Sequence, residues 1–142
     1  MPAQPLSPDL IDLPTGWVPA LLRGAKGRCP RCGEAALFRK WLKPVEACPH
    51  CRCDWSVQQA DDFPAYIGIF VVGHLLAPVV ITMIGTLGLS AWLTLAIILP
   101  VAVAMLLGML QPVKGAVIGF LWWHGIGAFR QERRASPPAE EP

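Results

Sequence analysis

The longest feature of the hydrophobic pattern is a run without charged residues, from residue 63 to residue 113. It holds no Asp, Glu, Lys or Arg, and His74 is its one side chain that titrates near neutral pH. A helix rises about 1.5 Å per residue, so one crossing of about 30 Å of hydrocarbon takes about 20 residues. The run is long enough for two crossings and too long for a soluble helical core in a small chain. We therefore predict transmembrane helices over residues 65–88 and 91–110, joined by a short turn.

A third apolar segment follows, from residue 113 to residue 130. Its apolar part would extend only about 21 Å as a helix, which is too short to cross the hydrocarbon. Trp122 and Trp123 are the residue type that anchors helices at headgroup depth. We predict an interfacial or re-entrant helix over residues 113–130. The spacing of Gly115 and Gly119 favours a face that another helix can approach closely.

The charged residues predict how this hairpin is oriented. All 12 Lys and Arg residues lie before the uncharged run or after it, and the turn around Ser90 has none. Because cytoplasmic flanks are enriched in Lys and Arg, we expect both termini on the cytoplasmic side. A net charge of +2 gives no argument for nucleic acid binding. A high content of Pro and polar side chains predicts a disordered lead over residues 1–15 and a disordered tail over residues 131–142.

The most specific motif lies in residues 16–60, ahead of the membrane part. Two CxxC pairs, Cys29 with Cys32 and Cys48 with Cys51, are separated by fifteen residues. This spacing is typical of a four-thiolate zinc site, because two residues between thiols let a tight turn present both sulfurs to one tetrahedral ion. We predict that these four cysteines bind a structural Zn²⁺, and that residues 16–60 form a small zinc-ribbon-like β module around it.

Several alternatives stay open at this site. A reducing compartment favours metal binding over disulfides, but an iron centre or a redox-active thiol pair would use the same cysteines. Gly33 follows the first pair and permits the positive φ that such a turn often needs. Cys53 is left over, either as a small buried thiol or as an exchangeable ligand, and His50 is expected to be exposed within the second turn.

Other residues outside the cysteine motif are candidates for function. Asp61 and Asp62 precede the first span, where they can cap the helix or bind a basic group of a partner. His74 lies near mid-span. It can be interpreted as a neutral side chain with a hydrogen bond across the hairpin, as a haem or copper ligand, or as part of a proton relay. Met105 and Met109 share a helix face, for core packing or as a Cu(I) thioether pair.

Four groups of residues carry a further resemblance when taken together: the first Cys pair with its flanks from Arg28 to Glu34, Leu37-Phe38-Arg39 with Leu42-Lys43, Asp61-Asp62-x-Pro64-Ala65, and Pro112-x-Lys114-Gly115. With the second Cys pair and the two spans, residues 22–130 resemble the bacterial family known as domain of unknown function 983. The resemblance implies a small inner-membrane protein without assigned activity. It also implies genes that often lie near those of haem-copper oxidase subunits and assembly factors. The chain departs from the family at Arg52 and Phe63, where the family usually or often has Gly.

The expected fold is therefore membrane α-helical, with the β module before the two-helix hairpin and the interfacial helix after it. The leading hypothesis is a non-enzymatic adaptor or assembly factor for a membrane complex such as a haem-copper respiratory oxidase. This hypothesis assigns the protein no catalytic residue and no small-molecule substrate, because the sequence shows no nucleophile–base pair or phosphate loop. The expected partner contacts are Arg31, Arg39, Asp61, Asp62 and Lys114. The alternative is a copper or thiol-redox handling factor that uses Cys53, or His74 with the two methionines.

Overall fold

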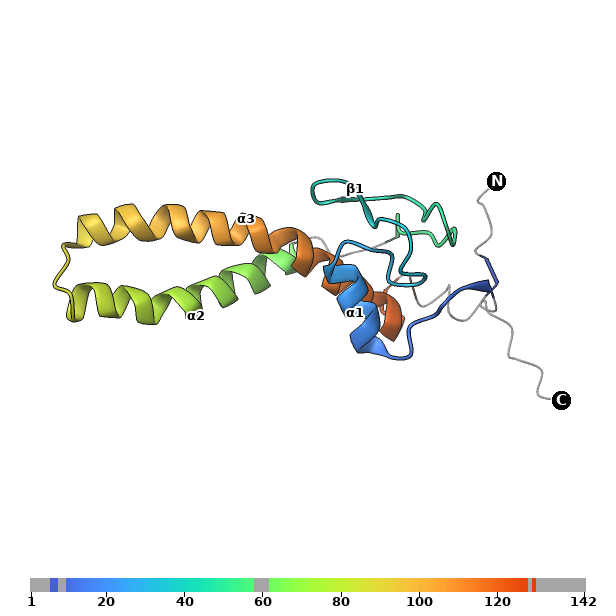
Figure 1. The fold of residues 1–142 in the computed structure, drawn as a ribbon, viewed down its shortest axis with the longest axis horizontal. Helices are drawn as coiled ribbons and strands as arrows, with labels where there is room; N and C mark the ends of the chain where they lie inside the picture. Colours follow the sequence, from blue (N-terminus) through green and yellow to red (C-terminus); the bar gives the residue numbers. More distant parts are fainter. Residues whose placement is uncertain (1–5, 8–9, 58–61, 128, 130–142) are drawn as a thin grey trace.

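The computed structural model describes residues 6–7, 10–57, 62–127 and 129 of the chain. Its elements in chain order are α1 (Trp17–Ala25), β1 (Phe38–Lys40), β2 (Lys43–Pro44), α2 (Phe63–Gly85) and α3 (Ala91–His124). α2 and α3 form a long antiparallel hairpin, while α1 and the sheet gather around the far end of α3 (Figure 1). Asp61 and the predicted tail lie outside the described residues.

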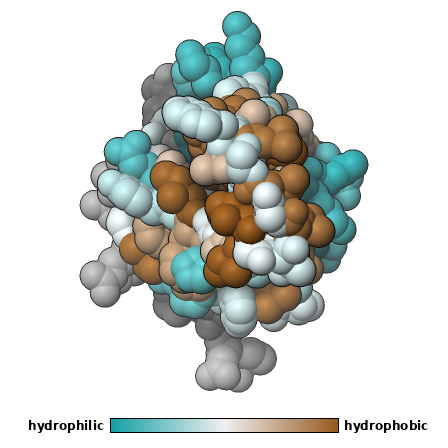
Figure 2. Space-filling view, turned by 90° about the vertical axis from the view of Figure 1, so that its left-hand side faces the viewer, coloured by the Kyte–Doolittle hydropathy of each residue, from teal (hydrophilic) through white to brown (hydrophobic). Residues whose placement is uncertain are grey.

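The helices of the hairpin are both long and apolar enough to cross a membrane. α2 begins two residues before the predicted span, and α3 begins at the predicted residue. In the turn between them Gly88 has a positive φ of 62°, and the Ser90 hydroxyl accepts a hydrogen bond from the backbone N–H of Leu93 at 3.3 Å. Large apolar side chains face outward on both helices, with Ile81 71% and Trp92 82% exposed. Seen from the turn end, hydrophobic residues gather over the hairpin (Figure 2). Helices that are apolar all round are typical of membrane spans and of buried cores.

The C-terminal half of α3 differs from the prediction. In place of a separate helix over residues 113–130, α3 continues through Pro112 to His124. A proline inside a helix removes one backbone hydrogen bond and costs about 3 kcal/mol. Burial after Pro112 offsets that cost, since Ile118 is fully buried and Trp122 is 8% exposed. The 34 residues of α3 extend about 51 Å, which exceeds the hydrocarbon thickness by about 20 Å.

α1 packs against this extension of α3 through small residues. A Cβ added to Gly24 would overlap the carbonyl oxygen of Gly115, and a Cβ on Gly115 would overlap that of Gly24. A Cβ on Gly119 would lie 2.5 Å from the carbonyl oxygen of Ala20. The close-approach face predicted at Gly115 and Gly119 is therefore present, and its partner is α1.

α1 buries its small residues rather than its large ones. The buried residues are Ala20 and Gly24, while Trp17 and Leu22 are each 49% exposed. Small side chains lie inward because the two backbones approach so closely. Trp17 rests edge-on against Phe120 of α3, with ring centroids 6.4 Å apart.

The sheet of the module is short and lies close to α3. β1 and β2 pair antiparallel, with Phe38 opposite Pro44 and Lys40 opposite Lys43. In the turn between them Leu42 has a left-handed φ of 61°, and its carbonyl accepts a hydrogen bond from Nζ of Lys114 on α3 at 3.0 Å. This contact fixes the tip of the sheet to the helix.

A shared core joins the module to the end of α3. Trp55 is fully buried, with its ring centroid 6.3 Å from that of Trp122 and 5.6 Å from that of Phe129. Leu37, ahead of β1, is fully buried, whereas Trp41 between the strands is 55% exposed. The module therefore has no separate core but shares one with the extension of α3.

The described part of the lead contacts the module. The backbone N–H of Leu6 donates to the Cys51 carbonyl at 3.1 Å, and the side chains of Arg23 and Asp12 form an ion pair at 3.0 Å. These two contacts place Leu6 against the second cysteine turn and Asp12 against α1. Residues 1–5 and 8–9 lie outside the description.

Candidate metal centre

The two CxxC pairs form two matching backbone turns. In the first, the N–H of Gly33 donates to the carbonyl of Cys29 at 2.8 Å, and in the second the N–H of Arg52 donates to the carbonyl of Cys48 at 2.9 Å. Both turns end in a left-handed residue, with φ 73° at Gly33 and 58° at Arg52. The arrangement lets each turn present two sulfurs to the same side.

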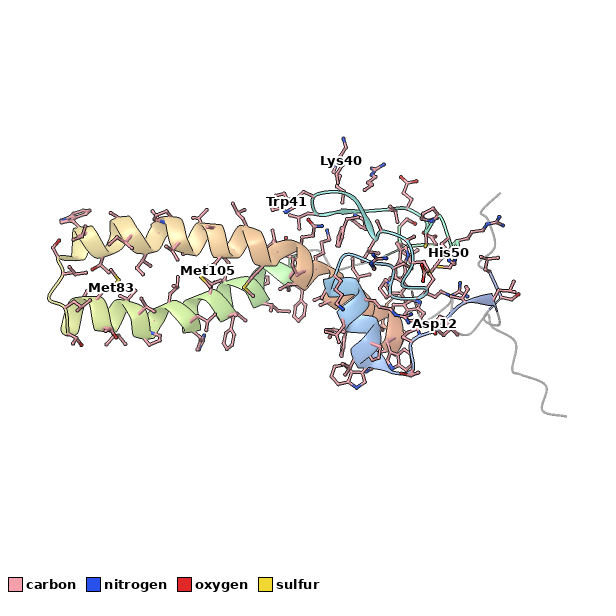
Figure 3. All side chains as sticks on the ribbon, in the orientation of Figure 1. Asp12, Lys40, Trp41, His50, Met83 and Met105 are labelled. Carbon is pink, nitrogen blue, oxygen red and sulfur yellow. The ribbon has the colours of Figure 1, made fainter. Side chains whose placement is uncertain are left out.

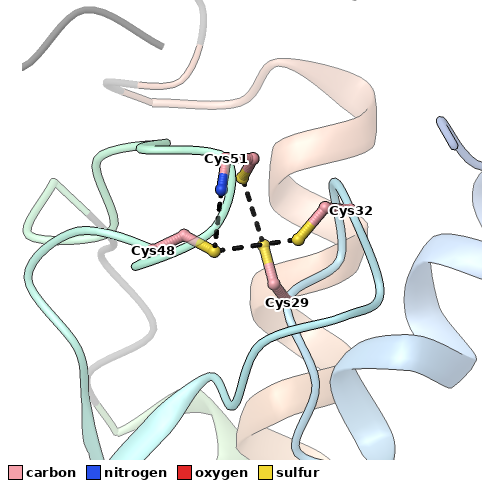
Figure 4. Close-up of side chains that lie close together, drawn as sticks. All are labelled: Cys29, Cys32, Cys48 and Cys51. Carbon is pink, nitrogen blue, oxygen red and sulfur yellow. Dashed lines mark hydrogen bonds between the residues drawn. The ribbon is translucent and has the colours of Figure 1, made fainter. Parts of the chain in front are cut away.

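The four sulfurs converge on one point between the turns (Figure 4). The Sγ atoms of Cys29 and Cys51 are 3.7 Å apart, as are those of Cys32 and Cys48, and all four sulfurs lie within 4.8 Å of one another. None of these cysteines is in a disulfide. Sulfurs bound at about 2.3 Å to one tetrahedral ion are about 3.8 Å apart. The observed spacing therefore fits a single tetrahedral metal ion, as the sequence predicted.

The thiols perturb one another's ionisation. Hydrogen bonding by Cys29 lowers the pKa of Cys51 to about 4. The same contact, together with burial, raises the pKa of Cys29, and burial raises the pKa of Cys48 to about 11. The cluster therefore favours one thiolate, on Cys51, near neutral pH. A bound cation would supply the positive charge that favours thiolates at the remaining sulfurs.

Burial closes the site to water. All four cysteines are at most 2% exposed, and they belong to the core that contains Trp55 and Ile118. Four thiolates fill a tetrahedral ion, which leaves no position for a substrate or a water. The four cysteines are therefore a candidate metal centre with a complete set of ligands.

Arg31 supports the second turn, a role that the sequence did not reveal. Its guanidinium donates to the Cys51 carbonyl at 3.2 Å and to the Leu6 carbonyl at 2.7 Å, and the residue is only 8% exposed. Arg31 stands between two ligands in sequence, and this position suggested a solvent-facing cation. Only the fold shows that its side chain reaches across to the opposite turn.

The other residues of the cysteine motif lie beside the cluster. Cys53 is fully buried but is not among the four converging sulfurs. His50 is exposed, as expected (Figure 3). In the described part of the chain, Cys29, Cys32, Cys48 and Cys51 are the one group of three or more His, Cys, Asp or Glu side chains placed to hold a metal.

The predicted partner contacts are spread over the molecule. Arg39 is exposed on β1, and Asp62 is exposed at the start of α2 without a capping hydrogen bond from its side chain. Lys114 is half-buried and bonded to Leu42. Arg31 is buried, so among the described members of this group only Arg39 and Asp62 are exposed.

The candidate residues on α2 and α3 make contacts within their own helix or within the hairpin. Nδ1 of His74 donates to the Phe70 carbonyl at 2.8 Å, one turn back, rather than across the hairpin to Thr94. His124 repeats this geometry with the Phe120 carbonyl at 3.0 Å. Met105 lies along α3, partly buried in the hairpin (Figure 3).

Comparison with known proteins gives one match. A family model described as "Protein of unknown function (DUF983)" matches residues 38–122. This match covers more than half of the chain, so the protein belongs to that family, as its motifs suggested. It spans the second Cys pair, α2 and nearly all of α3. No curated protein and no solved structure matches.

Proposed function

We propose that this protein is a non-enzymatic integral membrane protein with a structural zinc site, and that it serves as an adaptor or assembly factor for a larger membrane complex. The observation that carries the proposal is the docking of the cysteine module onto the extension of α3. Gly24 against Gly115, and Trp55 against Trp122, fix the module relative to the hairpin. A rigid polar module at the end of an apolar hairpin is suited to holding a partner at a defined place.

The proposed membrane insertion rests on α2 and α3. Both have the length and apolar composition of a span, and their large side chains are exposed to the surroundings. We place the module and both termini on the cytoplasmic side of the bacterial inner membrane, because Lys and Arg occur only outside residues 63–113.

The metal that we propose is Zn²⁺. The two sulfur separations of 3.7 Å, the convergence of all four sulfurs within 4.8 Å and the four-thiolate set support it. When bound, the ion would crosslink the two turns and contribute free energy to folding. The chain's own Arg31 holds the backbone of the second turn in place.

Arg39 and Asp62 are the predicted contacts that remain available to a partner. Both are exposed, whereas Arg31 and Lys114 are used inside the chain. Phe63, which follows Asp62, lines an apolar groove of about 430 Å³ together with Leu21 and Phe120, and this groove is open to an apolar segment of a partner. The gene context implied by the family resemblance favours a haem-copper respiratory oxidase or its assembly machinery as that partner.

The test is purification of the tagged protein from its native membrane in mild detergent, with mass spectrometry of the proteins and metals that elute. We expect stoichiometric subunits of one membrane complex, and one zinc per chain. An Arg39→Glu variant should lose the partner and keep zinc. Arg52→Glu, which changes an exposed cation on the second cysteine turn, is the matched control and should keep both.

Two outcomes would contradict the proposal. Recovery of the protein alone, with wild type and both variants alike, would exclude a stable adaptor. Recovery with copper or haem in addition to zinc would favour the metal-handling alternative, and would direct attention to His74 and the methionines of the hairpin.

A further inference from the structure

A second groove lies where the end of α1, the tip of the sheet and α3 meet. It has a volume of about 350 Å³ and is lined by Lys26 and Gln111, by Trp41, and by Leu107 and Gly108. This groove is amphipathic. Lys26 and Gln111 supply hydrogen-bond donors, while the remaining three residues supply an aromatic and an aliphatic wall.

Its position along α3 is at the boundary of the uncharged run. Leu107 and Gly108 are among the last residues of α3 before Lys114, the first cation after the run. Trp41 is 55% exposed and, with Leu107 and Gly108, lines the groove. Tryptophan favours headgroup depth, so the groove spans the level at which lipid phosphates meet acyl chains.

The charge around the groove is positive. Arg39, Lys40 and Lys43 are exposed on the strands that flank Trp41, and residues 35–45 contain no acidic side chain. Lys26, at the end of α1, adds a cation to the wall itself. An anion is therefore the complementary ligand.

The apolar half of the groove has room for a chain of methylene groups. A Cβ added to Gly108 would meet nothing within 4 Å, so the surface over this residue is open. An acyl chain could lie against the backbone at Gly108 and the side chain of Leu107. Apolar area buried in this way is favourable.

We propose that this groove binds one anionic phospholipid, with its phosphate at Lys26 and an acyl chain along Leu107 and Gly108 beneath Trp41. This inference rests on the proposed insertion of α2 and α3 into the membrane. The bound lipid would fill the gap between the sheet tip and α3, and would couple the cysteine module to an anionic membrane surface.

The test is native mass spectrometry of the zinc-loaded full chain, titrated with phosphatidylglycerol or with phosphatidylcholine of the same acyl chains. We expect one phosphatidylglycerol to bind preferentially. Lys26→Gln should weaken its binding by about fivefold, the effect of about one basic residue near an anionic lipid. Gly108→Leu should also weaken it, by filling the apolar half.

Two matched controls test the site. Lys40→Gln removes a cation that points away from α3 (Figure 3), and Gly73→Leu adds the same side chain at an open position on α2. Both should bind as wild type does. If Lys40→Gln weakens phosphatidylglycerol binding as much as Lys26→Gln does, the lipid is attracted by the overall positive charge and not bound at a defined site. Equal binding of the two lipids by the wild-type protein would overturn the proposal outright.

Failure of the proposed membrane insertion gives a separate result. If the chain is recovered from cells in the soluble fraction without detergent, the membrane assignment is wrong before any lipid is measured. A chain that needs detergent and shows no preference between the two lipids keeps its membrane assignment and lacks the lipid site. Zinc content and elution volume, measured for every variant, show whether Gly108→Leu has folded.

Discussion

Gly33 and Arg52 occupy equivalent places in the two cysteine turns and share one backbone conformation. Each follows the second cysteine of its pair, donates its N–H to the carbonyl of the first cysteine, and has a positive φ, 73° and 58° respectively. A side chain in this conformation costs roughly 1–2 kcal/mol, which glycine avoids. The second turn therefore keeps the geometry of the first despite Arg52, and stores strain that the first turn does not.

Replacing Arg52 by Gly should stabilise the protein. Relief of the left-handed strain exceeds the entropy that glycine adds to the unfolded chain, for a net gain of up to about 1 kcal/mol. Gly33→Ala should destabilise it by at least about 1 kcal/mol, because the new Cβ is strained and lies 3.1 Å from the Arg23 side chain. Thermal unfolding of the zinc-loaded protein in detergent measures both changes in stability. A destabilised Arg52→Gly variant would contradict the left-handed conformation of Arg52.

The contact of α1 with α3 predicts a second pair of variants. Gly115→Ala places a methyl group onto the Gly24 carbonyl oxygen, so α1 must move away at a cost of about 1–3 kcal/mol. Gly108→Ala, on the same helix, meets open space and is the matched control. Limited proteolysis after Arg23 or Lys26 should accelerate in Gly115→Ala alone. Equal proteolysis of the two variants would show that α1 does not depend on this contact.

The sequence predicted the parts of this fold that local patterns encode. The uncharged run predicts two long apolar helices, because a bilayer excludes charge along about 20 residues. The CxxC spacing predicts four converging sulfurs, because each turn is local. The helix itself continues beyond the predicted span, since Pro112 is a local signal for a break that burial of Ile118 and Trp122 overrides.

The docking of the module could not be predicted in the same way. The spacing of Gly115 and Gly119 predicted a close-approach face, but no local signal in the sequence identified α1 as its partner. The roles of Arg31 and Lys114 depend on carbonyl groups of Cys51 and Leu42, which are distant in sequence. Contacts of this kind depend on tertiary packing, which the hydrophobic periodicity of the sequence does not predict.

The Lys114 contact makes a prediction about the sheet tip. Lys114→Met retains the apolar stem but removes the donor to the Leu42 carbonyl, so the β1–β2 turn should detach from α3. A hydrogen bond from a charged, half-buried donor contributes about 1.5 kcal/mol, equivalent to roughly tenfold faster hydrogen exchange where the turn opens locally. Exchange at residues 40–43 should accelerate by about that factor. Lys43→Met, an exposed cation of the same turn, should leave exchange unchanged, and the idea fails if the two variants behave alike.

The cysteines differ in what their loss should do. Cys48→Ser removes one of the four converging sulfurs, so bound zinc should fall from one per chain to a small fraction, and the module should become sensitive to protease. Cys53→Ser alters a buried thiol outside the cluster and should retain one zinc, with a modest loss of stability from burying a hydroxyl. Elemental analysis of the purified variants separates these outcomes. Loss of zinc in Cys53→Ser would make that residue a ligand.

Zinc binding should release protons, and its affinity should rise with pH. The raised pKa values of Cys29 and Cys48 mean that both are protonated at pH 7, whereas Cys51, with its pKa lowered to about 4, already carries a negative charge. Zinc must displace at least those two protons, so its apparent affinity should increase about tenfold per pH unit for each of them between pH 6 and 8. Calorimetry of zinc binding to the metal-free protein, in buffers of different ionisation enthalpy, counts the protons directly. Release of fewer than two protons would mean that the metal-free cluster holds more thiolates than these pKa shifts allow. A nearby cation such as Arg31 would then be the first candidate for the charge that stabilises the additional thiolate.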